Sequence, residues 1–111
     1  MAKITKVNTK RSAFSAAAFA AANPSAAVET GADDRMVLLV RNTAEAAKTL
    51  TVKAGTALQG VADLEISVPA STAAGILPLE SGKYVQVSGE NAGCILVEAE
   101  AGIELACAIL P

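Results

Sequence analysis

The chain has 111 residues, of which 52% are hydrophobic but only 3% aromatic, so we expect a single domain with an aliphatic core. It contains no histidine and only two cysteines, which excludes a Ser–His catalytic pair and leaves too few ligands for a structural zinc site. The net charge of −2 is unevenly distributed, because the first eleven residues carry +4 and the remainder carries −6. The four cations of this basic segment are Lys3, Lys6, Lys10 and Arg11. We interpret the segment as an arm that could contact the acidic body of a neighbouring copy, and a solvated, disordered N-terminus is the other interpretation.

The hydropathy pattern argues against a membrane protein and against a secreted one. No apolar stretch approaches the ~20 residues that a helix needs to span a bilayer. The N-terminus lacks the continuous apolar segment of a secretory signal, and the alanines at 16–22 are too weakly hydrophobic to supply one. We therefore expect a soluble protein that is made in a cytoplasm.

The N-terminal third is difficult to assign from its sequence. Residues 1–11 alternate in part between apolar and polar, so they could add as a strand to the edge of a sheet. The alanine-rich segment from Ser12 to Asn23 has high helix propensity. Phe14 and Phe19 are five positions apart, however, which places them on different sides of a helix and on opposite faces of a strand. Because the segments that follow are strand-like, we favour an extended arm over residues 1–34.

The clearest strand signals lie between residues 36 and 55. Met36–Val40 is apolar without interruption, which predicts a strand that is covered on both faces. The polar segment 42–47 favours a turn. Beyond this turn the chain alternates, with Leu50 and Val52 on one side and Thr49 and Thr51 on the other. This pattern predicts a half-exposed strand beside a buried one.

Further strands are predicted towards the C-terminus. Residues 63–68 alternate, with Leu64, Ile66 and Val68 pointing inward, and Pro69 ends the run. We expect additional strands over 73–79, 83–88, 94–98 and 103–110, separated by turns. A turn at 31–34 and a loop at 56–62 are expected earlier in the chain, ahead of the strands at 36–40 and 63–68. The chain is therefore predicted to be all-β: an antiparallel β-sandwich of about seven to nine short strands, with a body over 35–111 and an extended N-terminal arm.

Few residues suggest chemistry. If the last two strands form a tight hairpin about Glu100, Cys94 faces Cys107 at a separation that a disulfide could bridge. We favour two reduced thiols that pack as small hydrophobic groups. Glu98, Glu100 and Glu104 would then surround the hairpin tip, where a solvated surface is a simpler interpretation than a weak cation site. We predict that the protein is not an enzyme and has no cofactor.

Four segments of the chain resemble small β-sandwich virion proteins of tailed bacteriophages. They are RMVLLVRNTAEAAKTLTVKAG (35–55), GVADLEISVPAS (60–71), LPLESGKYVQVSG (77–89) and GCILVEAEAGIELACAILP (93–111). The similarity covers residues 35–111 and consists of strands and turns. It implies a capsid decoration (cement) protein or a related capsid-associated subunit, and it supplies no catalytic residues.

The resemblance and the basic arm together suggest a function. We expect a virion structural protein, assembled in the bacterial host cytoplasm, that decorates and stabilises a phage capsid by bridging neighbouring capsid subunits. The expected partners are the major capsid protein and copies of the chain itself, as a homo-oligomer. Membrane binding is not expected, and nucleic acid is disfavoured because four cations without interleaved aromatic residues form a weak site. The candidate partner-binding residues are Lys3, Lys6, Lys10, Arg11, Phe14 and Phe19.

Two other functions remain open. A head–tail connector or tail subunit would also be a small β-fold in a symmetric ring, and sequence does not separate it from a shell protein. A glycan-binding module is the third candidate. Sugar platforms usually rely on exposed aromatic faces, and this chain offers only Phe14, Phe19 and Tyr84.

Overall fold

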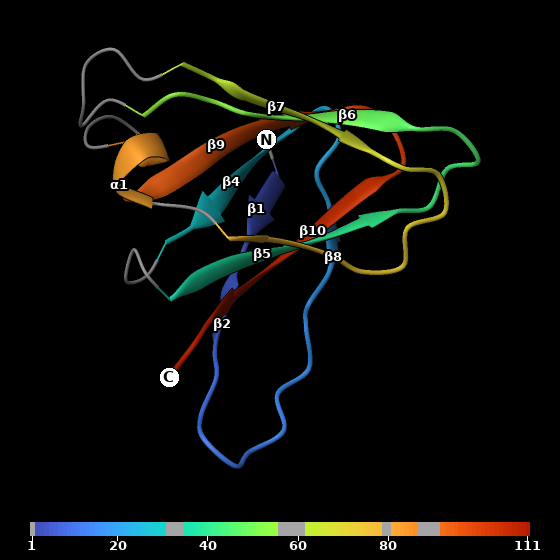
Figure 1. Cartoon of the computed structure of the whole chain (residues 1–111). Coiled ribbons are helices and arrows are strands. Elements are labelled where there is room, and N and C mark those ends of the chain that lie inside the picture. The colour runs from blue at the N-terminus through green and yellow to red at the C-terminus, as the bar shows by residue number, and fades with distance from the viewer. Residues whose placement is uncertain (1, 31–34, 56–61, 79–80, 87–91) are drawn as a thin grey trace.

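The chain forms a two-layer β-sandwich in the computed structural model, which describes residues 2–30, 35–55, 62–78, 81–86 and 92–111 (Figure 1). The elements in these ranges are β1 (Ala2–Ile4), β2 (Lys6–Asn8), β3 (Ala20–Ala21), β4 (Ser25–Glu29), β5 (Met36–Asn42), β6 (Lys48–Val52), β7 (Leu64–Val68), β8 (Gly75–Pro78), α1 (Ser81–Tyr84), β9 (Cys94–Ala99) and β10 (Ile103–Ile109). This architecture confirms the predicted all-β sandwich.

Each layer is one sheet. Sheet A has the order β1-β4-β9-β6-β7, and sheet B has the order β2-β10-β5-β8, with β3 also pairing to β10. Among the described strands, β1 and β2 run parallel to their partners β4 and β10, whereas the other pairs are antiparallel. The two parallel pairs involve the N-terminal segment, because it follows the edge of one sheet and then of the other in a single direction.

The core lies between the sheets and is built from aliphatic side chains. The β5–β10 register pairs Leu38 with Cys107 and Val40 with Leu105, and alternation then points these four side chains into the sandwich. Leu50 and Val52 of β6 enter from sheet A and are fully buried, as their alternation predicted. Each buried aliphatic side chain of this size contributes about 1.5–3 kcal/mol relative to an exposed one.

The first third of the chain supplies strands to both sheets. β1 pairs with β4 in sheet A, and β2 pairs with β10 in sheet B, so the chain passes from one layer to the other at Thr5. Ile4 is fully buried at this crossing. Lys6 closes the same edge, because its Nζ donates a hydrogen bond to the Thr30 carbonyl at 3.0 Å. The strands within residues 2–8 therefore pair with strands of their own chain.

Two local predictions were wrong. β9 and β10 do not form a hairpin: β9 pairs with β4 and β6 in sheet A, while β10 pairs with β5, β2 and β3 in sheet B. Cys94 and Cys107 consequently lie in different layers, and both are free thiols. The strand expected from residue 83 begins instead as the helical turn α1, followed by a single bridge between Val85 and Ile95. The turn expected at 31–34, most of the loop expected at 56–62 and the end of the 83–88 strand lie outside the described residues.

One buried polar side chain connects the β5–β6 turn to the end of β7. Asn42, at the end of β5, is 1% exposed, and its Nδ2 donates to the carbonyls of Ala46, Val68 and Pro69 at 3.1 Å each. Its Oδ1 accepts a hydrogen bond from the Ala44 N–H at 2.9 Å. Asn42 therefore fixes the β5–β6 turn against the end of β7.

Candidate interaction surfaces

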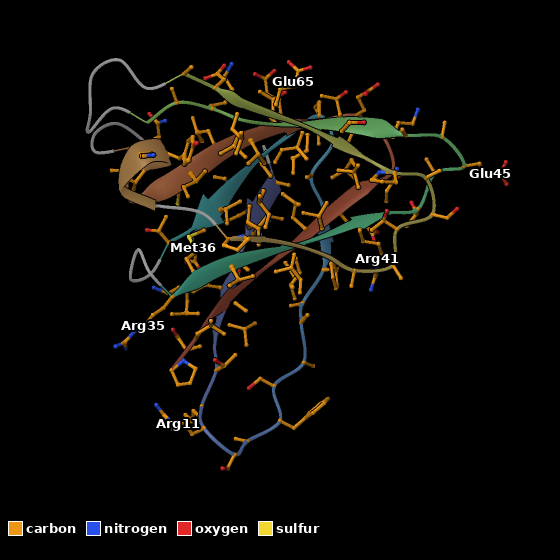
Figure 2. All side chains as sticks on the ribbon, viewed as in Figure 1. Arg11, Arg35, Met36, Arg41, Glu45 and Glu65 are labelled. Atoms are coloured by element: carbon orange, nitrogen blue, oxygen red, sulfur yellow. The ribbon has the colours of Figure 1, made fainter. Side chains whose placement is uncertain are left out.

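A long loop projects from the sandwich between β2 and β3. It spans residues 9–19, and Figure 1 shows it extending well beyond both sheets. Every side chain from Lys10 to Ala18 is exposed, and Phe14 is 95% exposed. Arg11 lies near the far end of the loop (Figure 2). The loop therefore presents one large aromatic side chain and two cations to the surroundings, with no acidic residue.

Both ends of this loop are held to sheet B. The Thr9 N–H and hydroxyl both donate to the Ile109 carbonyl, at 2.9 and 2.7 Å. At the other end, the Arg41 guanidinium lies 4.0 Å from the centre of the Phe19 ring, a cation–π contact. The anchors leave the tip extended, because the residues between them have no hydrophobic partner.

The six candidate residues are thus distributed over three environments. Lys10, Arg11 and Phe14 are exposed on the loop. Lys6 is bonded to Thr30 at the closed edge of the sandwich, and Phe19 packs under Arg41. Lys3 is exposed on the outer face of sheet A, since its register partner Ala27 points outward there.

The two outer faces of the sandwich differ in chemistry. Glu65 points away from sheet A, and Arg41 points away from sheet B (Figure 2). The outward positions of sheet A are mainly polar: Lys3, Ser25, Glu29, Thr49, Thr51, Glu65, Ser67 and Glu98. The exceptions are Ala27, Cys94 and Leu96. The outward positions of sheet B are mainly apolar: Val7, Ala21, Val37, Leu39, Ile76, Pro78, Ala106 and Ala108, with Arg41 and Glu104.

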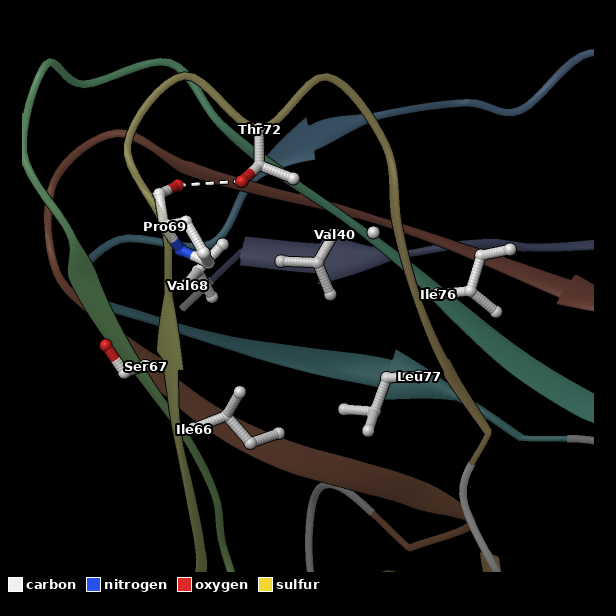
Figure 3. A pocket seen from close by; sticks show the side chains of 9 residues that line it. Val40, Ile66, Ser67, Val68, Pro69, Thr72, Ile76 and Leu77 are labelled. Atoms are coloured by element: carbon white, nitrogen blue, oxygen red, sulfur yellow. Dashed lines mark hydrogen bonds between the residues drawn. The ribbon is translucent and has the colours of Figure 1, made fainter.

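An apolar groove runs along the side of the sandwich where β7 and β8 form the edges. Ile66 and Leu77 point toward one another across it, whereas Ile76 points away (Figure 3), and Val40 also lines the groove. The groove has a volume of about 160 Å³ and ends where the Thr72 hydroxyl donates to the Pro69 carbonyl at 2.7 Å. None of its lining residues is charged.

The carboxylates that could have bound a cation are occupied by protein groups. Lys53 lies between Asp63 and Glu98, at 2.8 and 3.1 Å. The side-chain hydrogen bond from Lys53, together with the Ala54 N–H, lowers the pKa of Asp63 below its ordinary value. The Thr49 N–H donates to Glu100 at 2.7 Å and is the main cause of the lowered pKa of that carboxyl. These exposed pairs each contribute little stability, because water and salt screen them.

Potential metal ligands do not cluster in the part of the chain that the structure describes. No group of three or more His, Cys, Asp or Glu side chains gathers there in a way that could hold a metal ion. Cys107 is buried on the inward side of β10, and burial raises the pKa of its thiol to about 11, which keeps it protonated at neutral pH.

Comparison of the chain with family models, with curated proteins and with solved structures finds no match. Within the described residues, the helical content includes no segment with the length and hydropathy of a transmembrane helix. The fold and the exposed surfaces are therefore the basis for a functional proposal.

Sequence reasoning identified part of these surfaces. It selected the cations and aromatic residues of the loop because they are unusual in this composition. It missed the apolar outer face of sheet B. The uninterrupted apolar run in β5 was a signal for this face, but we interpreted the run as a strand that its own fold covers on both faces.

Proposed function

We propose that the chain is a virion structural protein that decorates and stabilises a phage capsid by bridging neighbouring capsid subunits. The observation that carries this proposal is the loop 9–19, which projects beyond both sheets and exposes Phe14, Lys10 and Arg11. The resemblance of residues 35–111 to phage virion proteins supplies the identity of the expected partner, the major capsid protein.

The physics of a repeating shell suits such a loop. A single exposed aromatic residue and two screened cations give a weak contact. On a lattice, however, contacts of one symmetric assembly reinforce one another through effective concentration, so weak individual contacts suffice. The sandwich provides a rigid base, and the loop provides the reach between neighbouring subunits.

The alternatives are less well supported. A glycan-binding module needs exposed aromatic platforms, but Phe19 is covered by Arg41 and Tyr84 is partly buried, which leaves Phe14 alone. A connector or tail subunit would use the same kind of loop, and its copy number per particle separates it from a shell protein.

The proposal is tested by substituting the loop rather than deleting it. Removal of residues 1–22 would also remove the buried Ile4 and three paired strands, so binding and folding would be lost together. The variant Lys10→Ser/Arg11→Ser/Phe14→Ala changes exposed side chains only. Lys48→Ser, which removes a cation from β6, is the control.

Decoration of expanded heads built from the major capsid protein of the same phage is then measured by co-sedimentation. We expect the triple variant to bind at least tenfold more weakly than the wild type, and Lys48→Ser to bind normally. Wild-type binding should also weaken as salt is raised, since the cationic contacts are screened. Equal decoration by the triple variant and the wild type would refute the role of the loop.

A further inference from the structure

We propose that two copies of the chain exchange their N-terminal segments, residues 2–9, so that the segment of each copy occupies the site of the same segment in the other. This exchange takes place in the free protein and does not depend on the proposed capsid role. Two features favour it. The site that holds the segment is built from residues beyond the loop 9–19, and the loop contains a strained turn.

The site lies along one side of the sandwich and takes an extended strand. Without the segment, β4 would be an edge of sheet A, and the end of β10 at 107–109 would be an edge of sheet B. The segment covers both edges, since β1 pairs with β4 and β2 pairs with β10. Between them, Ile4 is fully buried opposite Val28, which is fully buried as well. The site thus recognises its occupant by strand pairing and by one apolar anchor.

Polar contacts fix the register of the segment in this site. The Lys6 N–H donates to the Glu29 carboxylate at 3.0 Å, and the Lys6 Nζ donates to the Thr30 carbonyl at 3.0 Å. The Thr9 N–H and hydroxyl donate to the Ile109 carbonyl at 2.9 and 2.7 Å. Each of these acceptors follows the loop in the sequence. A second copy therefore offers the same acceptors, and an exchanged segment makes the same contacts.

Charge complementarity identifies the segment of another copy as the occupant. The first eleven residues carry +4 without an acidic residue, whereas the remainder of the chain carries −6. Glu29 places one of these negative charges in the site itself. The body of each copy therefore attracts the N-terminal segment of any other copy.

The loop is long enough to reach a neighbouring copy. Asn8 lies opposite Ile109 and Ala20 lies opposite Leu105, so the two ends of the loop are four residues apart along β10, or about 13 Å. The eleven residues 9–19 extend to about 36 Å. Because every side chain from Lys10 to Ala18 is exposed, straightening the loop gives up no buried contact of these side chains.

The turn at Ser12 favours exchange over the closed monomer. Ser12 has a φ of 58°, in the left-handed region that is unfavourable for a residue with a Cβ atom. It lies in a turn in which the Ala13 N–H donates to the Lys10 carbonyl at 3.4 Å. This turn directs the segment back to its own body. A loop that runs straight to a second copy does not need the turn, so exchange relieves the strain.

The balance between the two forms depends on concentration. Exchange replaces each contact of the segment with an identical one in the partner, so the site itself favours neither form. A short flexible linker holds a segment near its own site at an effective concentration of about a millimolar. We therefore expect closed monomers at micromolar concentrations and reciprocal dimers as the concentration approaches about 1 mM.

The direct test links two positions that face each other across the β1–β4 pair. Lys3 and Ala27 are register partners, and paired strands lie about 4.8 Å apart, which a disulfide can bridge. One full-length chain carries Lys3→Cys and another carries Ala27→Cys. They are mixed at about 1 mM with oxidised glutathione. Neither chain contains both introduced thiols, so a disulfide between these thiols records an exchanged segment.

Mass spectrometry of the covalent dimers identifies the linked positions. The control mixture combines Lys3→Cys with Ser67→Cys, which places a thiol at an exposed position of β7, the far edge of the same sheet. We expect the disulfide between positions 3 and 27 to form at least tenfold more than the disulfide between positions 3 and 67. Equal yields of the two disulfides overturn the proposal.

A second test changes the loop and needs no introduced cysteine. Glycine accepts a positive φ without strain, whereas proline is fixed near −65° and excludes it. In sedimentation equilibrium up to about 1 mM, we expect Ser12→Pro to dimerise at least tenfold more tightly than Ser12→Gly, with the wild type between them. Ser12 is exposed, and circular dichroism establishes that both variants are folded. Association of Ser12→Pro that is no tighter than that of Ser12→Gly overturns the proposal.

Discussion

Replacement of Asn42 tests how the sandwich holds the ends of its strands together. Asn42→Ala removes three donated hydrogen bonds and one accepted bond from a side chain that is 1% exposed. The bond to the Val68 carbonyl is buried, whereas those to Ala46 and Pro69 are partly accessible to water. Leaving a buried acceptor unpaired costs about 1–3 kcal/mol, and each partly accessible bond contributes about 0.5–1.5 kcal/mol.

We therefore expect Asn42→Ala to lower the free energy of unfolding by about 3 kcal/mol. At roughly 4 °C per kcal/mol for a domain of this size, the melting temperature should fall by about 12 °C. Asn42→Asp should be more damaging at neutral pH, because it directs a carboxylate at three carbonyl oxygens. Its deficit should shrink as the pH is lowered and the carboxyl group gains a proton that it can donate.

The assay is urea denaturation followed by circular dichroism at several pH values. The slope of the free energy of unfolding against urea concentration should be the same for each variant, which shows that the unfolding reaction is unchanged. Asn8→Ala, at an exposed position of β2, is the control and should lie within about 0.5 kcal/mol of the wild type. If Asn42→Asp is as stable as Asn42→Ala at neutral pH, the amide does not act as the donor described here.

Three further predictions concern the two thiols and a pair of glycines. Cys94 is half-buried and should react with iodoacetamide in the folded protein well before Cys107, whose buried thiol has a pKa of about 11. Mass spectrometry of the labelled protein measures the labelling rate at both sites. Equal rates would contradict the prediction. Because the unfolded thiol ionises near 9.0 and the folded one only near 11, the free energy of unfolding should also fall as the pH rises through this interval, and Cys107→Ala should remove that part of the fall. Gly102→Ala should destabilise the fold more than Gly93→Ala, by at least about 1 kcal/mol in thermal unfolding. Both glycines have positive φ, at 103° and 83°, but only at Gly102 would the new Cβ meet another atom, Ala44 Cβ at 2.9 Å. If the two variants lose the same amount of stability, this contact is relieved without cost.

The strands were predictable where the signal is local. Alternation over β6 and β7 placed Leu50, Val52 and Ile66 on the inward side, because a period of two in hydropathy is a property of neighbouring residues. The turn after β5 followed from its polar composition. The lean towards an extended rather than helical Ala-rich segment also agrees with the structure, in which residues 12–23 contain no helix.

Sheet membership depends on contacts that are distant in sequence. The short link between β9 and β10 could close a hairpin or cross between layers, and both choices bury the same aliphatic side chains. The crossing is favoured here because β9 finds partners on both sides, β4 and β6, and β10 likewise finds β2 and β5. Propensity and alternation contain no information about these partners.

The same limit applies to the candidate surfaces. Asn42 is a common turn residue, and its role depends on the arrival of Val68 and Pro69, which are 26 and 27 positions away. The loop is defined by an anchor between Thr9 and Ile109, 100 positions apart. Composition identified Phe14 and its neighbouring cations. Only the fold distinguishes these exposed residues from Lys6, which forms a hydrogen bond with Thr30 of the same chain.

The number of copies per particle tests the central claim most directly. Quantitative mass spectrometry of purified phage particles compares this chain with the major capsid protein. A shell decoration protein should be present at on the order of hundreds of copies, in a simple ratio to the capsid subunits, whereas a connector ring would give about six or twelve. The account predicts the first result, and the second, or particles that lack the chain, would contradict it.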